Sequence, residues 1–222
     1  GSAAATLAHE IKNPLGAISL QTDILARSAG EAESEQILAI RSEIGRIREQ
    51  VNRIGDYLRK TEGDRIEFDL KDLVQEVLAR QPSSKEIHID TDPGGLPVLA
   101  MREKLSSIIE NLLQNALESG SPPQKIGLRL VRSGEQALLE LSDRGCGLPE
   151  GMDSERLFMP FFTTKTQGFG LGLALARRFA RELGGELSLE GRSTGGMLAR
   201  LSIPLSRGAT EKKGTDNDRS RP

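Results

Sequence analysis

The sequence predicts an α+β protein in which a hairpin of two long helices precedes a sandwich of strands and helices. One observation is the spacing of apolar residues, three and four apart, along the first 58 residues. The other is the alternation of strand-like runs with shorter helical patterns in the rest of the chain. Hydrophobic residues make up 36% of the sequence and aromatic residues only 3%, so we expect a soluble protein with a core of Leu, Ile, Val and Ala.

An apolar seam of the heptad type runs along each of the first two helical segments. The first seam comprises Leu7, Ile11, Leu15, Ile18, Thr22 and Leu25, and the second Ile37, Ile40, Ile44, Ile47, Val51, Ile54 and Leu58. The polar stretch from Ser28 to Ser34 suits a hairpin turn. Each seam needs more partners than one hairpin supplies, so we expect a homodimer that forms a four-helix bundle. Taken alone, the seam favours a generic coiled-coil dimeriser.

The helical pattern breaks at residues 61–64, which we interpret as a linker. It separates a hairpin domain (1–60) from a sandwich domain (65–206), and a polar tail (207–222) is expected to be disordered. Helices are predicted after a capping Asp69, over 102–118, and over about 171–183 before Gly184-Gly185. Strands are predicted at 65–68, 86–91, 97–100, 125–132, 136–142, 186–190 and 197–204. Antiparallel runs with the helices segregated from them predict an α/β sandwich, with Ile87 and Ile89 facing inward and His88 outward.

Composition excludes several classes of function. A net charge of −2 gives no general attraction to nucleic acid. No run approaches the roughly 18 apolar residues that span a bilayer, so we expect no membrane contact by this segment. The single cysteine, Cys146, allows no internal disulfide and fits a cytoplasmic location. A sensor region or a membrane anchor upstream of Gly1 remains possible.

The first chemical motif is the run from Ala8 to Leu15. His9 lies about 200° around the helix from Ile11 and therefore faces away from the seam. Its neutral ring nitrogen is a competent nucleophile near neutral pH, and Glu10 beside it could accept the proton of the other nitrogen. Asn13 shares the His9 face and could orient a water molecule, and Pro14 kinks the helix. The plain alternative is a surface histidine beside a tolerated proline.

The second motif places Asn111 and Asn115 four residues apart on one helical face. Amide oxygens can complete a Mg²⁺ shell, and amide nitrogens can meet phosphate oxygens. The third motif, Asp143 to Pro149, follows a strand. Asp143 could accept hydrogen bonds from adenine, while Gly145 and Gly147 remove side chains where a flat base would approach. Taken singly, these motifs could be two exposed asparagines and an ordinary glycine-rich turn.

The fourth motif combines hydroxyl groups, a cation and a glycine-rich approach to a helix. Thr163, Thr164 and Lys165 offer groups for phosphate oxygens, and the helix N–H groups that follow can bind anions. The glycines have the spacing G-x-G-x-G, which matches neither the dinucleotide-binding nor the P-loop pattern. They lie in the run Gly168, Phe169, Gly170, Leu171 and Gly172.

Together, in this order, the four motifs resemble those of the histidine kinases of two-component systems. His9 matches the H box, Asn111 and Asn115 the N box, and Phe161 and Phe162 the F box. Asp143, Gly145 and Gly147 match the first glycine box, and Gly168, Gly170 and Gly172 the second. The resemblance covers about residues 3–205. It implies a dimeric hairpin that carries the phosphoacceptor histidine, followed by an ATP-binding domain of the GHKL superfamily with a short lid over 148–170.

The resemblance also implies a mechanism. ATP with Mg²⁺ would bind through Asn111, Asn115, Asp143 and the glycines, with Asn115 on the metal. Phe162, Thr163, Thr164, Lys165, Leu171 and Gly172 would complete the nucleotide site, Lys165 also acting in catalysis. His9 would become phosphorylated with Glu10 as base and then serve an aspartate on the receiver domain of a response regulator. Asn13 would orient water for the reverse, phosphatase reaction.

Two alternatives are weighed against this expectation. One is a GHKL ATPase of the chaperone, topoisomerase or mismatch-repair type. Such enzymes generally place a glutamate base four residues before the metal-binding asparagine, where this chain has Asn111. Glu110 is adjacent but points about 100° elsewhere on the helix. The other is a non-enzymatic scaffold with a degenerate nucleotide site, which the intact motifs disfavour.

Overall fold

The computed structural model describes residues 15–26, 31–58, 63–165 and 170–206. The chain forms two compact units. One comprises Gly1–Glu62 together with Leu157–Leu175, and the other comprises Gly63–Arg156 together with Ala176–Pro222. The domain boundaries expected from the sequence stay a prediction.

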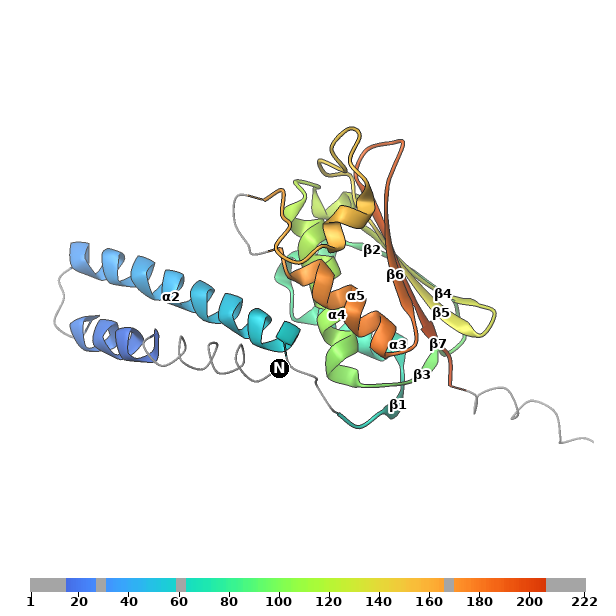
Figure 1. Ribbon diagram of the computed structural model, residues 1–222, viewed down its shortest axis with the longest axis horizontal. Helices are drawn as coiled ribbons and strands as arrows, with labels where there is room; N and C mark the ends of the chain where they lie inside the picture. The colour runs from blue at the N-terminus through green and yellow to red at the C-terminus, as the bar shows by residue number, and fades with distance from the viewer. Residues whose placement is uncertain (1–14, 27–30, 59–62, 166–169, 207–222) are drawn as a thin grey trace, which may run out of the picture. The chain divides into compact units, whose positions relative to one another are not determined.

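The first unit contains the helical hairpin (Figure 1). Residues 15–26 are helical, and α2 spans Glu31–Leu58. An ion pair between Arg41 Nη2 and Asp23 Oδ1 at 3.0 Å joins the two helices. The turn expected over Ser28–Ser34 is shorter than predicted, because α2 already begins at Glu31.

The two seams divide into a packed half and an exposed half. Seam residues seven apart are buried in the hairpin; they are Leu15 and Thr22 on one helix and Ile37, Ile44 and Val51 on α2. The alternate seam residues Ile18, Leu25 and Ile40 are exposed, with 47% of Ile40 accessible. The seam residue Ile47 is half-buried. Among the described seam residues, a single hairpin therefore leaves Ile18, Leu25 and Ile40 exposed.

The second unit is built on a five-stranded sheet with the order β2-β4-β5-β7-β6. The strands are β2 (His88–Thr91), β4 (Gly127–Ser133), β5 (Gln136–Ser142), β6 (Glu186–Gly191) and β7 (Met197–Pro204). The pairs β4–β5, β5–β7 and β6–β7 are antiparallel, as expected, whereas β2 runs parallel to β4. A small antiparallel pair joins β1 (Ile66–Asp69) to β3 (Pro97–Ala100).

Three helices lie against one face of this sheet (Figure 1). They are α3 (Leu70–Ala79), α4 (Arg102–Glu118) and α5 (Gly172–Glu182), of which the part from Ala176 belongs to this unit. Residues alternate between buried and accessible along β5 and β7, so one face of each strand packs on the helices. The largest fully buried side chains are aliphatic, as the composition predicted; they are Leu70, Leu73, Leu96, Leu105, Ile108, Ile109, Leu113, Ile126, Leu130, Leu139, Leu187 and Leu201.

Asp69 caps α3 as predicted. Its Oδ1 accepts a hydrogen bond from the backbone N–H of Lys71 at 2.9 Å, which satisfies a donor in the first turn. The same carboxylate accepts from the N–H of Leu96 at 3.2 Å and so also holds the chain just before β3.

The other face of the sheet carries a row of alternating charges that crosses all five strands. Arg129 on β4 pairs with Asp90 on β2 at 3.5 Å and with Glu140 on β5 at 3.4 Å. Arg200 on β7 pairs with Glu140 at 2.9 Å and with Glu190 on β6 at 2.6 Å. Opposite charges on neighbouring strands support this strand order.

Strand β2 differs most from its prediction. It begins at His88 rather than Glu86, because residues Pro82–Glu86 form a 3₁₀ helix. Ile87 is buried and His88 exposed, as expected, but the expected burial of Ile89 is wrong, since 45% of it is accessible. Because β2 is an edge strand, Ile89 has a neighbouring strand on one side only, although its partner Leu128 is buried.

Candidate functional site

Helix α4 carries both predicted asparagines, and both side chains are half-buried. Asn111 Nδ2 donates to the carbonyl of Ser107 one turn earlier, at 2.8 Å. This bond fixes the amide and leaves its Oδ1 as the group that can meet a ligand, with no donor to it in the described part of the chain. Asn115 lies one turn further along the same face.

The glutamate beside Asn111 is engaged elsewhere. Glu110 Oε1 accepts from Arg80 Nη1 at 3.2 Å and from Ser106 Oγ at 3.0 Å. Arg80 is the residue at which α3 ends, so this ion pair ties α3 to α4. Glu110 therefore acts as a structural link between helices, which agrees with its expected direction away from the asparagine face.

Asp143 directly follows β5 and is 5% exposed. Its Oδ1 accepts from the backbone N–H of Gly145 at 2.7 Å and from that of Met197 at 3.4 Å. Its other oxygen, Oδ2, receives no hydrogen bond from any residue that the structure describes. The carboxylate is thus held through one oxygen, while the second can accept from a ligand.

Gly145 packs against the end of α4. A Cβ atom at this position would lie 2.1 Å from Ser119 Oγ and 2.3 Å from the Ser119 carbonyl oxygen. The N–H of Cys146 donates to that carbonyl at 3.0 Å. The absence of a side chain at Gly145 therefore lets the Asp143 loop lie directly on the helix that carries the asparagines.

The turn between β6 and β7 also holds Asp143, and sequence reasoning missed this contact. Gly196 has φ of 84°, and a Cβ there would lie 2.1 Å from the Asp143 carbonyl oxygen. That carbonyl accepts from Arg192 Nη1 at 2.8 Å. Gly147 meets the same turn, since a Cβ on it would lie 3.3 Å from the Gly196 backbone. The signal in the sequence was the pair Gly195-Gly196 just before a strand.

The predicted lid residues from Phe162 to Gly172 belong to the first unit and are described separately. The backbone N–H of Phe161 donates to the carbonyl of Gly170 at 3.1 Å, which brings the F box and the second glycine box together. A Cβ on Gly170 would lie 2.2 Å from the Phe162 carbonyl oxygen, so only glycine fits. Thr163 Oγ1 accepts from the N–H of Lys165 at 3.1 Å; Thr163, Thr164 and Lys165 are exposed, and Leu171 is buried.

The remaining predicted residues lie outside the described residues; they are His9, Glu10, Asn13 and Gly168. Among the described residues, no three His, Cys, Asp or Glu side chains gather into a metal-binding group. A Mg²⁺ ion at α4 would thus depend on amide oxygen and nucleotide phosphates, a donor set that Mg²⁺ accepts because it retains waters and binds phosphate. The half-buried asparagines fit that role.

Two family descriptions match the chain. "His Kinase A (phospho-acceptor) domain" matches residues 1–63, and "Histidine kinase-, DNA gyrase B-, and HSP90-like ATPase" matches residues 100–207. The catalytic domain of histidine kinase ThkA is 32% identical and has a TM-score of 0.57; the match covers 64% of this chain and 97% of that one. Full-length ShkA, solved in complex with AMPPNP, is 22% identical and has a TM-score of 0.75. The match covers 91% of this chain and 45% of ShkA, and at this identity it supports the fold alone.

Curated relatives agree with this assignment. Sensor protein FixL of Bradyrhizobium diazoefficiens is 28% identical over 92% of this chain and 43% of its own length. Histidine-protein kinase AtoS of Escherichia coli is 29% identical over 92% of this chain and 35% of its own length. The chain therefore spans less than half the length of these relatives.

Fold, motif order and relatives together define the class as the two-component histidine kinases, with a GHKL-type ATP-binding domain. The chain belongs to the sensor histidine kinase family and contains its catalytic core. Within the part of the chain that the structure describes, no helix is both long enough and apolar enough to cross a bilayer.

Proposed function

We propose that this chain uses ATP and Mg²⁺ to phosphorylate its own His9 and passes the phosphoryl group to an aspartate on the receiver domain of a response regulator. The observation that carries the proposal is Asp143. A buried carboxylate whose Oδ1 is occupied and whose Oδ2 has no donor among the described residues is suited to the amino group of adenine. Membership of the histidine kinase family supports a histidine as the acceptor of the phosphoryl group.

The α4 asparagines would hold the phosphate end of the nucleotide. Asn115 is our candidate Mg²⁺ ligand, and Asn111, with its nitrogen already bonded to Ser107, would present its oxygen. The cation would neutralise charge on the phosphates. Phosphoryl transfer has a loose transition state, so alignment and charge neutralisation account for most of the catalysis.

On the acceptor side, we assign His9 as nucleophile, Glu10 as the group that accepts the imidazole proton, and Asn13 as the residue that orients water when the regulator is dephosphorylated. Phe162, Thr163, Thr164 and Lys165, with Gly168, Gly170, Leu171 and Gly172, would border the phosphates. The exposed half of the α2 seam supports a homodimer. We place the segment in the cytoplasm, where response regulators and ATP are found.

The fate of the γ-phosphate separates this proposal from an ATPase. Glu110 lies in an ion pair with Arg80, which supports the absence of a hydrolytic base beside Asn111. With γ-labelled ATP and Mg²⁺, we expect label on the protein and little free phosphate, followed by loss of protein label when a cognate receiver domain is added. Rapid release of free phosphate with an unlabelled protein would instead favour the ATPase.

A further inference from the structure

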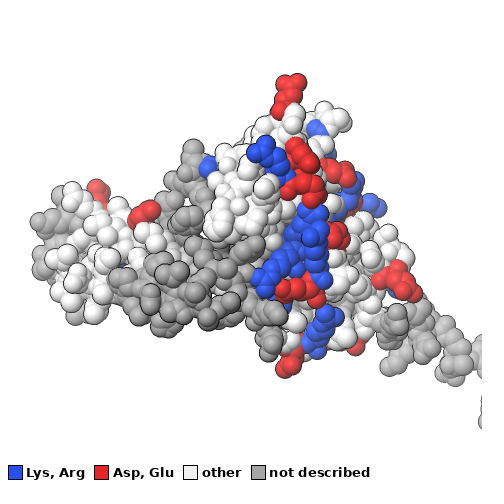
Figure 2. Space-filling model, in the orientation of Figure 1, with Lys and Arg blue, Asp and Glu red and all other residues white. Residues whose placement is uncertain are grey.

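The second unit contains a cluster of charges whose members come from either side, in sequence, of the predicted phosphate-binding segment. Arg177, in the middle of α5, forms an ion pair with Glu155 in the short helix Ser154–Phe158. It also pairs with Glu186 on β6 at 3.1 Å, and Arg181 pairs with Glu186 at 3.2 Å. Figure 2 shows the basic side chains gathered over α5 with acidic ones between them.

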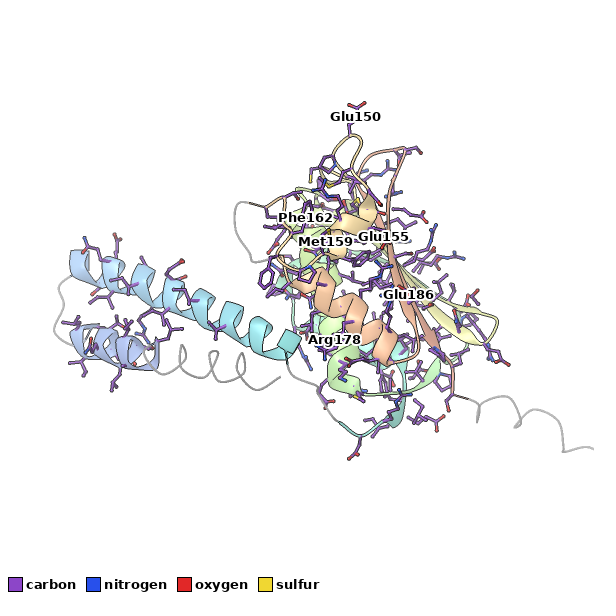
Figure 3. The ribbon with its side chains drawn as sticks, in the orientation of Figure 1. Glu150, Glu155, Met159, Phe162, Arg178 and Glu186 are labelled. Carbon is purple, nitrogen blue, oxygen red and sulfur yellow. The ribbon has the colours of Figure 1, made fainter. Side chains whose placement is uncertain are left out.

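Arg177 pairs with two carboxylates and is less exposed than either of them. The side chain of Arg177 is only 18% exposed, whereas Glu155 is 59% exposed and reaches it from outside. The two hydrogen bonds from Arg177 use different nitrogens, Nη1 for Glu155 and Nε for Glu186, so the planar guanidinium holds both carboxylates in a fixed arrangement. Figure 3 labels Glu155 and Glu186, the two carboxylates that pair with Arg177.

The ion pairs of the cluster shift the pKa of Arg177 and the pKa of Glu186. The hydrogen bond to Glu155 raises the pKa of Arg177, against the effect of its burial. Partial burial alone would raise the pKa of Glu186, but the hydrogen bonds from Arg181 and Arg177 lower it. Both shifts favour the charged forms of Arg177 and Glu186.

The sequence positions of Glu155 and Arg177 indicate a role for their ion pair. Glu155 and Arg177 are 22 residues apart and flank the segment that holds Phe162, Thr163, Thr164 and Lys165 and the second glycine box. The helix that contains Glu155 is itself capped, since Asp153 Oδ1 accepts from the Glu155 N–H at 2.9 Å. Fixing both ends of a loop reduces the conformations open to it, and so the entropy lost when it binds a ligand.

We propose that Arg177 and Glu155 are positioning residues for the nucleotide: their ion pair joins the two ends of the phosphate-binding segment and so lowers the ATP concentration needed for autophosphorylation. This inference rests on the proposed function. Neither residue touches the reacting atoms, so the pair acts on binding and leaves the chemical step unchanged.

The test compares Glu155→Gln with wild type in autophosphorylation with γ-labelled ATP and Mg²⁺. We expect the half-saturating ATP concentration to rise about two- to fivefold, the range for an exposed ion pair, with an unchanged maximal rate. The melting temperature without nucleotide should remain the same. The difference should shrink in about 1 M salt, because salt screens the pair.

Two matched variants control the result. Glu135→Gln makes the same charge change on an exposed side chain in the turn between β4 and β5, where the described residues offer it no hydrogen bond or ion pair. It should behave as wild type. Arg177→Gln should reproduce the effect of Glu155→Gln, and adding Glu155→Gln to it should cause no further change.

An unchanged half-saturating concentration in Glu155→Gln, or an equal rise in Glu135→Gln, would overturn the positioning role. A fall in maximal rate together with melting temperature would overturn it too, by assigning the pair to folding. If wild type binds no ATP and takes up no label, the proposed function itself fails, and that outcome is distinct from a variant that matches an active wild type.

Discussion

At the scale of single residues, we expect Asp143 to have a large effect on the affinity for ATP. An Asp143→Asn variant replaces one acceptor with a donor, which would face the amino group of adenine. We expect ATP affinity to fall about tenfold or more, the value of a hydrogen bond to a charged acceptor. Calorimetric titration with ATP measures this. Asp90→Asn on the outer face of the sheet is the charge-matched control, and equal affinities for Asp143→Asn and wild type would contradict the assignment.

Gly145 gives a second prediction, which concerns stability without any ligand. A Gly145→Ala side chain would collide with Ser119 at the end of α4, so we expect a loss of about 1–3 kcal/mol in the free energy of unfolding. Urea denaturation of the nucleotide-free protein measures it. Gly94→Ala is the control, because a Cβ there meets nothing within 4 Å. A loss of nucleotide affinity with full stability would instead support contact between Gly145 and the base.

A candidate site could be proposed from the sequence, but its local packing could not. The order of Asn111, Asn115 and Asp143 along the chain predicted the site, and their roles stay a prediction. The close packing of Gly145 on Ser119 and of Gly196 on Asp143 was not visible, because both contacts join segments far apart in sequence. Pattern reasoning therefore assigned Gly145 to the ligand, whereas the structure gives it a partner within the protein.

At the scale of elements, α4 and α5 are joined by a buried lysine. Lys104 is 4% exposed and pairs with Glu182 at 2.6 Å, while its ammonium lies 5.5 Å from the centre of the Phe179 ring. Arg178 also pairs with Glu182, at 2.8 Å. Burial by itself would raise the pKa of Glu182, but the hydrogen bonds from Lys104 and Arg178 lower it below its usual value.

The direction of this pKa shift predicts a pH dependence. A lowered pKa in the folded state means that Glu182 contributes stability above the usual carboxyl pKa of 4.5, and that this contribution is lost as pH falls through the folded value. We expect Glu182→Gln to lower the free energy of unfolding by about 1–2 kcal/mol at pH 7, because it removes the carboxylate that pairs with the buried Lys104 ammonium. Denaturation at several pH values measures the difference, which should vanish in acid. A difference that persists there would contradict the ion-pair account.

Elements with strong periodicity were predicted well. The bounds of α4 agree with the expected 102–118, and β3 and β5 have the expected residues. The edge strand β2 was predicted less well. Its start depends on the 3₁₀ helix Pro82–Glu86, and its exposure depends on its position at the edge of the sheet. Strand order and the parallel β2–β4 pair depend on contacts between distant segments, which local pattern does not contain.

At the scale of the whole molecule, the hairpin requires a partner. Ile40 lies on the exposed half of the α2 seam, and a charge there would be buried without a partner in a four-helix bundle. We expect Ile40→Glu to raise the dimer dissociation constant at least about 100-fold, as measured by sedimentation equilibrium. Leu38→Glu makes the same change on α2, at a residue that is 62% exposed and off the seam, and should leave the dimer intact. A dimer that survives Ile40→Glu would exclude this interface.

We propose that His9 is the residue that receives the γ-phosphate. Wild type and His9→Gln would be incubated with γ-labelled ATP and Mg²⁺, and the protein-bound label then tested in acid and alkali. We predict label on wild type alone, lost in acid and stable in alkali as expected for phosphohistidine. ATP binding should be equal in both proteins. Equal labelling of His9→Gln, or acid-stable label on wild type, would contradict the assignment.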